Sequence, residues 1–252
     1  MPLQENQLLR QAVELVNKHE ELKMMWKVIN INAIDRLGMS DHGWVHFQIV
    51  ANIALRIARI LMKNGVEMSV VKNYKLDDSY AELIVFLASI LHDLGMTIHR
   101  DGHEEYSLFL ADGIVKDLLA FLPVEKRVII KSEVLHAIIS HRSGGKPMTI
   151  EAGIVRVADA LDMSNGRSRI PFDAGKINIH SLSAFAIENI EIKEGTEKPV
   201  QIQIAMNNSA GIFQIDELLK SKLQDSGIAQ YFSVKGTIAG KTEKRLLKEF
   251  IL

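Results

Sequence analysis

The sequence predicts a mainly α-helical bundle followed by a small α+β domain. Over residues 1–165, apolar side chains recur every three or four positions in several segments, which is typical of amphipathic helices. Over residues 177–252, short segments alternate apolar and polar side chains, which is typical of strands. Residues 166–176 between them are irregular and basic, and they predict a linker.

The composition indicates a globular protein with an ordinary core. Of 252 residues, 47% are apolar and 24% are charged. The net charge of −1 gives no electrostatic reason to expect a nucleic acid or an anionic membrane as partner. The start lacks the regions of a signal peptide, and no uninterrupted apolar run reaches the roughly 18 residues that span a bilayer. We therefore expect a cytoplasmic protein. The absence of cysteine excludes disulfides and thiolate ligands.

Helical spacing predicts the first helices over residues 4–30 and 44–63, with Ser40 or Asp41 as the N-cap of the second. His46 lies on the apolar face of the second helix, where it is either a core residue or a ligand. His19, in contrast, lies among polar residues and predicts a solvated side chain. Residues 64–78 mix polar and apolar side chains and predict a surface connection.

The most unusual stretch runs from Leu83 to Gly95. It is apolar from Leu83 to Leu91, as expected of a helix buried on most sides, and then ends in the pair His92-Asp93. Two strongly polar groups at the end of a buried helix need partners, because an unpaired buried polar group is costly. Hydrogen bonds or a metal cation would satisfy them.

Three more helices are predicted, over residues 103–122, 124–142 and 150–161, with Pro123 ending the first and Thr149 capping the last. His103 begins the first of them, where it is either exposed near the cap or directed at the His92-Asp93 pair. Asp159 lies in the apolar run of the last, where the alternative to a ligand role is a salt bridge to Arg156 or Arg36.

The C-terminal region predicts strands over residues 187–193, 200–206 and 232–239, with a helix over residues 213–223. Residues 242–252 are compatible with strand or helix. Three roles are open for this domain: it covers a site, forms a homo-oligomer, or binds a regulator.

Six polar residues embedded in the apolar helices form an ordered series: His46, His92, Asp93, His103, His141 and Asp159. Their order resembles that of the HD superfamily of metal-dependent phosphohydrolases, and so do the local contexts. The resemblance covers residues 36–165. It is carried by His46-Phe47-Gln48-Ile49-Val50, Leu91-His92-Asp93-Leu94-Gly95, Ala137-Ile138-Ile139-Ser140-His141 and Val157-Ala158-Asp159-Ala160.

The resemblance implies a metal site. In that family the first His, the His-Asp pair and the last Asp bind one metal, which corresponds to His46, His92, Asp93 and Asp159. Some branches add histidines that hold a second metal, bridged by the Asp of the pair. His103 and His141 stand where those histidines would be, so two metals are expected, with one metal as the alternative. His42 is a candidate for supporting these ligands, and His99 and His136 are weaker candidates for ligation.

Imidazole and carboxylate ligands suit divalent Mn, Fe, Ni, Co or Zn, and such cations lower the pKa of water so that hydroxide can attack phosphorus in line. His92 and Asp93 are the predicted catalytic residues. Arg142, Lys146, Arg167 and Arg169 are candidate phosphate contacts, with plain surface charge as the alternative for each.

The predicted function is hydrolysis of a phosphate mono- or diester of a small metabolite or nucleotide, cyclic phosphates included. Two alternatives stay open. One is a metal- or nucleotide-binding regulatory or scaffold protein, and the other is metal-assisted hydrolysis at carbon.

Overall fold

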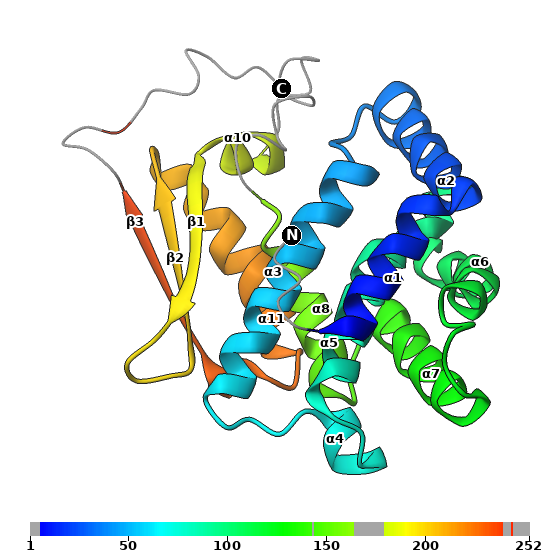
Figure 1. Cartoon of the computed structure of the whole chain (residues 1–252). Helices are drawn as coiled ribbons and strands as arrows, with labels where there is room; N and C mark the ends of the chain where they lie inside the picture. The colour runs from blue at the N-terminus through cyan, green and yellow to red at the C-terminus, as the bar shows by residue number, and fades with distance from the viewer. Residues whose placement is uncertain (1–5, 143, 164–178, 239–242, 244–252) are drawn as a thin grey trace.

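The computed structural model describes residues 6–142, 144–163, 179–238 and 243. Figure 1 shows helices α1 to α8 gathered beside a three-stranded sheet, with α11 between them. The mainly α-helical class and the small C-terminal sheet agree with the prediction. Buried apolar side chains from the helices and from the sheet form one contiguous cluster, so both regions share a core.

The N-terminal helical stretch is broken where one continuous helix was predicted. Helix α1 spans Gln7–Lys18 and α2 spans Glu20–Asn30, followed by a π-helical turn over Ile31–Arg36. His19 separates α1 from α2 in an extended conformation, and its ring accepts a hydrogen bond from the Leu22 N–H. His19 is half-buried, and its side chain caps α2, a contact that the prediction of a solvated side chain did not include.

Helices α3 (Trp44–Lys63) and α5 (Asp78–Leu91) form the centre of the helical part, and every residue of α5 from Tyr80 onward is buried. The N-cap position of α3 is Gly43, so neither predicted residue occupies it. Asp41 nevertheless acts chemically as a cap, since its Oδ1 accepts from the N–H groups of Gly43 and His46, each at 3.1 Å.

The connection before α5 is more ordered than predicted. It contains the short helix α4 (Ser69–Tyr74), and the side chains of Met68 and Val70 are buried against the core. A helix of six residues is too short to produce a recognisable period.

Two segments, Trp44–Lys63 and Asp78–Thr97, are long and apolar enough to cross a bilayer. Their most apolar windows are 56% and 94% buried inside the protein, which is how core helices behave.

Helices α6 (His103–Leu118), α7 (Val124–Ser140) and α8 (Ile150–Ala160) complete the helical part. Helix α6 ends four residues before its predicted end, and Pro123 is the N-cap of α7 instead of the terminator of α6. The side chain of Thr149 accepts from the Ala152 N–H and caps α8 as predicted.

The sheet has the order β1-β2-β3. Strand β1 (Ile187–Glu194) runs antiparallel to β2 (Val200–Met206), and β3 (Phe232–Ile238) runs parallel to β2. Parallel neighbours need a crossover connection, and here it is built from helical turns. These turns include Ser209–Gly211, the π-helical Gln214–Leu219 and α11 (Lys220–Gln224). A single helix was predicted over this segment. Helix α10 (Ile179–Phe185), which precedes β1, was not predicted.

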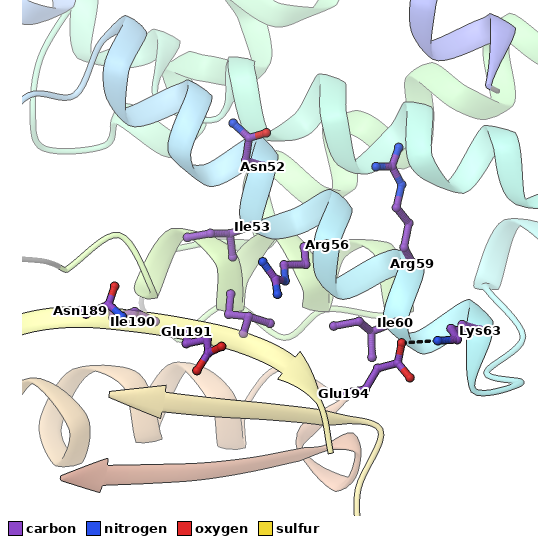
Figure 2. A pocket seen from close by; sticks show the side chains of 11 residues that line it. Asn52, Ile53, Arg56, Arg59, Ile60, Lys63, Asn189, Ile190, Glu191 and Glu194 are labelled. Carbon is purple, nitrogen blue, oxygen red and sulfur yellow. Dashed lines mark hydrogen bonds and ion pairs between the residues drawn. The ribbon is translucent and has the colours of Figure 1, made fainter. Parts of the chain in front are cut away.

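A groove of about 740 Å³ separates α3 from β1, and three basic side chains of α3 line it (Figure 2). Two of them are already paired. Arg59 Nε lies 2.7 Å from Glu82 Oε1, and Lys63 Nζ lies 2.5 Å from Glu194 Oε1. The second pair joins α3 to the sheet, so much of the positive charge in the groove is used within the protein.

Gly95 allows α6 to begin against the end of α5. Its N–H donates to Ser107 Oγ at 2.8 Å, and a Cβ atom at this position would overlap the carbonyl oxygen of His103. Any larger residue would therefore push the start of α6 away.

We predict that Gly95→Ala lowers the free energy of unfolding by about 1–3 kcal/mol, because the new methyl group has no space. Gly113→Ala is the matched control: it lies within α6, and nothing is within 4 Å of the position of its Cβ. The control should be neutral or stabilising by about 0.5–1 kcal/mol. Urea unfolding measures both, and equal stability of the two variants would contradict the prediction.

Candidate metal centre

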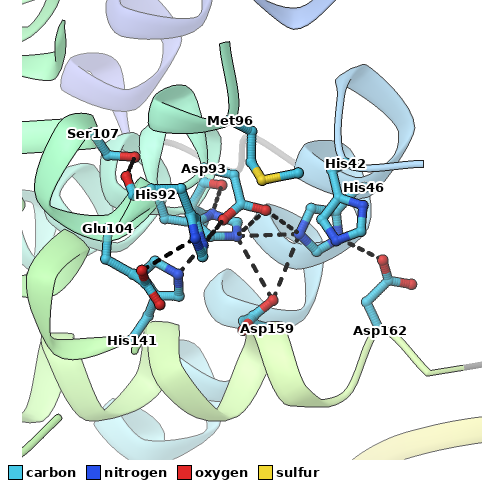
Figure 3. Close-up of polar contacts among 12 residues, drawn as sticks. His42, His46, His92, Asp93, Met96, Glu104, Ser107, His141, Asp159 and Asp162 are labelled. Carbon is cyan, nitrogen blue, oxygen red and sulfur yellow. Dashed lines mark hydrogen bonds and ion pairs between the residues drawn. The ribbon is translucent and has the colours of Figure 1, made fainter. Parts of the chain in front are cut away.

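The six residues of the predicted series converge at one place in the structure. Figure 3 shows His46, His92, Asp93, His141 and Asp159 there. His46 lies in the first turn of α3, and His103 is the first residue of α6. His92 and His141 directly follow the last residues of α5 and α7, and Asp159 lies near the end of α8. Five of the six are buried, and Asp159 keeps 19% of its side chain exposed.

The carboxylate of Asp93 faces two pairs of imidazoles, one with each oxygen. Its Oδ2 lies 3.7 Å from His46 Nε2 and 3.6 Å from His92 Nε2. Its Oδ1 lies 3.1 Å from His103 Nε2 and 3.6 Å from His141 Nε2. One buried carboxylate is thus shared between two adjoining sets of donor atoms. The first set includes His46 and His92, and the second set includes His103 and His141.

The first set has the spacing of a metal site. Asp159 Oδ1 lies 3.6 Å from His46 Nε2 and 3.7 Å from His92 Nε2, and the two Nε2 atoms are 3.1 Å apart. Ligands at about 2.1 Å from one cation, at tetrahedral or octahedral angles, lie about 3.0–3.4 Å from one another. The observed distances need only small adjustments to bind an ion.

All four imidazoles are oriented in the same way. Each ring pairs its Nδ1 with an oxygen atom, so Nε2 is the nitrogen directed at Asp93. With a proton, this nitrogen can donate to the carboxylate; without one, it offers its lone pair to a cation. The lone pairs of His46 and His92 would repel each other at 3.1 Å unless a proton or cation lay between them. The Nδ1 partners are Asp162 Oδ2 for His46 (2.6 Å), Ser89 O for His92 (2.8 Å), Arg100 O for His103 (2.8 Å) and Ile138 O for His141 (2.5 Å).

The two carboxylates remain ionised despite their burial. Burial alone would raise the pKa of Asp93, but the charge of His92 and hydrogen bonds from His103 and His141 hold the pKa well below its usual value. Burial likewise opposes ionisation of Asp159, and the positive charge of Lys222 with that of His92 overcomes it, so this pKa is also well below normal. Two anions facing four imidazoles suit a divalent cation.

Further residues contact the cluster, among them Arg100, whose Nη1 lies 3.1 Å from His103 Nδ1. Asp162 binds the outer nitrogen of His46, and Glu104 Oε2 lies 3.1 Å from His103 Nδ1. Lys222 Nζ lies 3.3 Å from Asp159 Oδ2. Position in the sequence could have suggested Asp162 and Glu104, since Asp162 follows Asp159 by three residues and Glu104 is adjacent to His103. Nothing local distinguishes Lys222, which is 63 positions from Asp159.

Glu104 extends the second set. One atom from each of His103, Glu104 and His141 lies within 4.8 Å of the others, a spacing that could hold an ion. A carboxylate besides that of Asp93 therefore lies next to the second set, in contact with the Nδ1 side of His103.

The other candidate histidines lie elsewhere or in supporting positions. His99 Nδ1 accepts from the Asp101 N–H and is exposed, and His136 Nε2 accepts from the Met148 N–H. His42 is buried, with its ring centroid 5.6 Å from that of His46.

The basic candidates are not gathered at the cluster in the described part of the chain. Arg142 pairs with Glu105 at the surface, Lys146 is exposed, and Arg167 and Arg169 lie outside the described residues. The alternative partners of Asp159 are engaged elsewhere. Arg36 donates to Asn32, and Arg156 donates to main-chain carbonyl groups.

Comparisons with known proteins agree with this geometry. The family model of the HD domain matches residues 43–164, a range that includes all six converging residues. The chain is also 44% identical over 236 residues to the uncharacterized protein MJ1020 of Methanocaldococcus jannaschii. That alignment covers 93% of this chain and 90% of the relative, so the similarity extends well beyond the matched domain.

We predict that Asp162→Asn weakens metal binding by about 10–100-fold, because the hydrogen bond that orients His46 is weakened while every ligand remains. Competition with a chelating dye measures the affinity. Asp112→Asn is the control, since Asp112 pairs with Lys131 at the surface. Similar affinities for the two variants would contradict the orienting role.

We also predict that metal affinity falls on acidification. Burial opposes protonation of His92, but Asp93 and Asp159 outweigh it and raise its pKa above the usual 6.5. Protons therefore begin to compete with the cation for His92 at a pH above about 6.5, and the competition grows as the pH falls. Protonation of the two carboxylates does not add to it until far lower pH. Affinity measured between about pH 5.5 and 8.5 should rise with pH; a flat profile would contradict the prediction.

Proposed function

We propose that the chain is a metal-dependent phosphohydrolase, because it belongs to the HD domain family and because its six converging His and Asp residues form two adjoining donor sets. The proposed substrate is a phosphate mono- or diester of a small metabolite or nucleotide, cyclic phosphates included.

The position of Asp93 supports the proposal most directly. Each oxygen of its carboxylate faces a separate imidazole pair, which is the arrangement expected for a carboxylate shared by two cations about 3.5–4 Å apart. Divalent cations held there would polarise water and neutralise charge on phosphate oxygens. We propose two ions of the Mn, Fe, Ni, Co or Zn group.

The chain's own contribution is orientation and charge. The Nδ1 contacts fix four rings with their Nε2 atoms inward, and Asp93 and Asp159 supply the negative charge that holds cations. Among the six, Asp159 has the most exposed side chain, so we infer that the phosphate group approaches from the Asp159 side. His92 and Asp93 are the proposed catalytic residues.

Purified protein should hydrolyse members of a panel of nucleotides, cyclic phosphates, sugar phosphates and a nitrophenyl phosphate ester, and chelation should abolish turnover. Asp93→Asn should lower kcat/KM by at least about 10²-fold, because both donor sets lose charge. Asp112→Asn should retain full activity. Bound metal without turnover of any substrate would instead favour a regulatory or scaffold role.

The number of ions is testable separately. Wild-type protein loaded anaerobically should carry close to two metal equivalents, and His103→Ala should lose about one, because His103 belongs to the second set alone. His99→Ala is the control, since His99 is exposed and bonds only the nearby main chain. Elemental analysis measures the content, and full occupancy in His103→Ala would contradict the proposal.

A further inference from the structure

Lys222 brings a positive charge to the metal centre from the C-terminal region. It lies on α11, within the crossover between β2 and β3. Its Nζ lies 3.3 Å from Asp159 Oδ2 and also donates to the carbonyl oxygen of His141. The ammonium group therefore contacts two of the six residues at the centre. The contacted atoms are Asp159 Oδ2 and the His141 carbonyl oxygen. Asp159 Oδ1 and His141 Nε2 therefore stay directed at the donor sets.

One face of α8 holds α11 in this position. Gly153, Arg156 and Asp159 follow one another at intervals of three, so they lie on one side of the helix. A Cβ at Gly153 would overlap the carbonyl oxygen of Ser226, which means that glycine permits the close approach of the segment after α11.

Arg156 bonds both α11 and the end of α7. It is 1% exposed, and its Nε donates to the carbonyl oxygen of Lys222 at 3.1 Å. Its Nη1 donates to the carbonyl oxygen of Ser140 at 3.1 Å and also to that of Arg142, on either side of His141. A buried guanidinium needs such partners. It fixes the main chain of Lys222 relative to the end of α7, which carries a proposed ligand.

The ammonium group has capacity left for a ligand. A lysine ammonium has three N–H donors, and within the described part of the chain Lys222 uses two of them, on Asp159 and His141. Its side chain is 23% exposed and that of Asp159, at 3.3 Å, is 19% exposed, so solvent reaches both side chains of this pair. A phosphate group that approached the centre from this side would meet Lys222 beside the donor sets.

We propose that Lys222 is a phosphate-binding residue of the active site, contributed by the C-terminal region: its ammonium group binds a non-bridging phosphate oxygen of the substrate. The assignment rests on the proposed phosphohydrolase function. It also gives the crossover a role in catalysis, because a fixed positive charge next to the reacting phosphorus stabilises the negative charge of the transition state.

The test uses metal-loaded full-length protein with inorganic phosphate as the probe. Lys222→Met removes the charge and keeps the length of the side chain. It should weaken phosphate binding by about tenfold or more in calorimetry and lower kcat/KM by about 10²-fold, with metal content unchanged. Lys220→Met is the matched control, because Lys220 lies on the same helix and pairs with Asp216 at the surface.

Lys222→Arg keeps the charge and should retain more phosphate affinity than Lys222→Met. Equal affinity of the two variants would overturn the assignment, as would phosphate affinity in Lys222→Met within about twofold of wild type. Loss of metal from Lys222→Met would also overturn it and make Lys222 a residue that only positions Asp159. If wild type binds phosphate through Lys222 but hydrolyses no ester, the proposed function fails while the phosphate site stands.

Discussion

The charge on Asp93 is the constraint on which the helical arrangement depends. A carboxylate with little exposure to water is stable only if positive or hydrogen-bonding groups surround it closely. No single helix could provide them, because a helix presents one or two side chains to a given point. The ends of α5 and α7 and the beginnings of α3 and α6 therefore meet where the imidazoles can reach both carboxylate oxygens. The apolar core brings these ends together, and the polar cluster fixes their register.

The backbone at these helix ends also sets the direction of the rings. His92, His103 and His141 each bond through Nδ1 to the carbonyl oxygen three residues earlier. For His92 and His141 these are carbonyl groups in the last turn of a helix, and that of Ile138 also accepts from the main-chain N–H of His141. The main chain at each helix end thus orients the ring so that its Nε2 faces Asp93.

The class of fold and the convergence of six residues could be predicted from the sequence, because histidine and aspartate side chains within apolar helices must bind one another or a cation to be stable there. The break between α1 and α2 and the short helix α4 could not be predicted. Five polar residues, from Asn17 to Glu21, interrupt the apolar period around His19, but their composition does not indicate that the His19 ring caps a new helix. Helix α4 is too short to show a period.

The contact of Lys222 with Asp159 could not be predicted for a different reason. Lys222 is part of a polar helix, and its neighbours in the chain predict one more solvated lysine. Its position depends on a packing arrangement in which Gly153 and Arg156 of α8 receive α11. This packing depends jointly on residues of α8 and α11 that are far apart in the sequence, so the pattern around any one of them does not predict it.

The parallel pairing of β2 and β3 has a consequence for how such a protein can diversify. Parallel strands cannot be joined by a tight turn, so a long connection from Met206 to Phe232 is obligatory, and this connection carries Lys222. The helices that carry the six converging residues and the charge beside them are therefore encoded in separate stretches of the chain. Insertions or deletions in the connection would shift the charge along α8 while leaving every ligand intact. Substrate preference could thus change without any change in the chemistry of the centre.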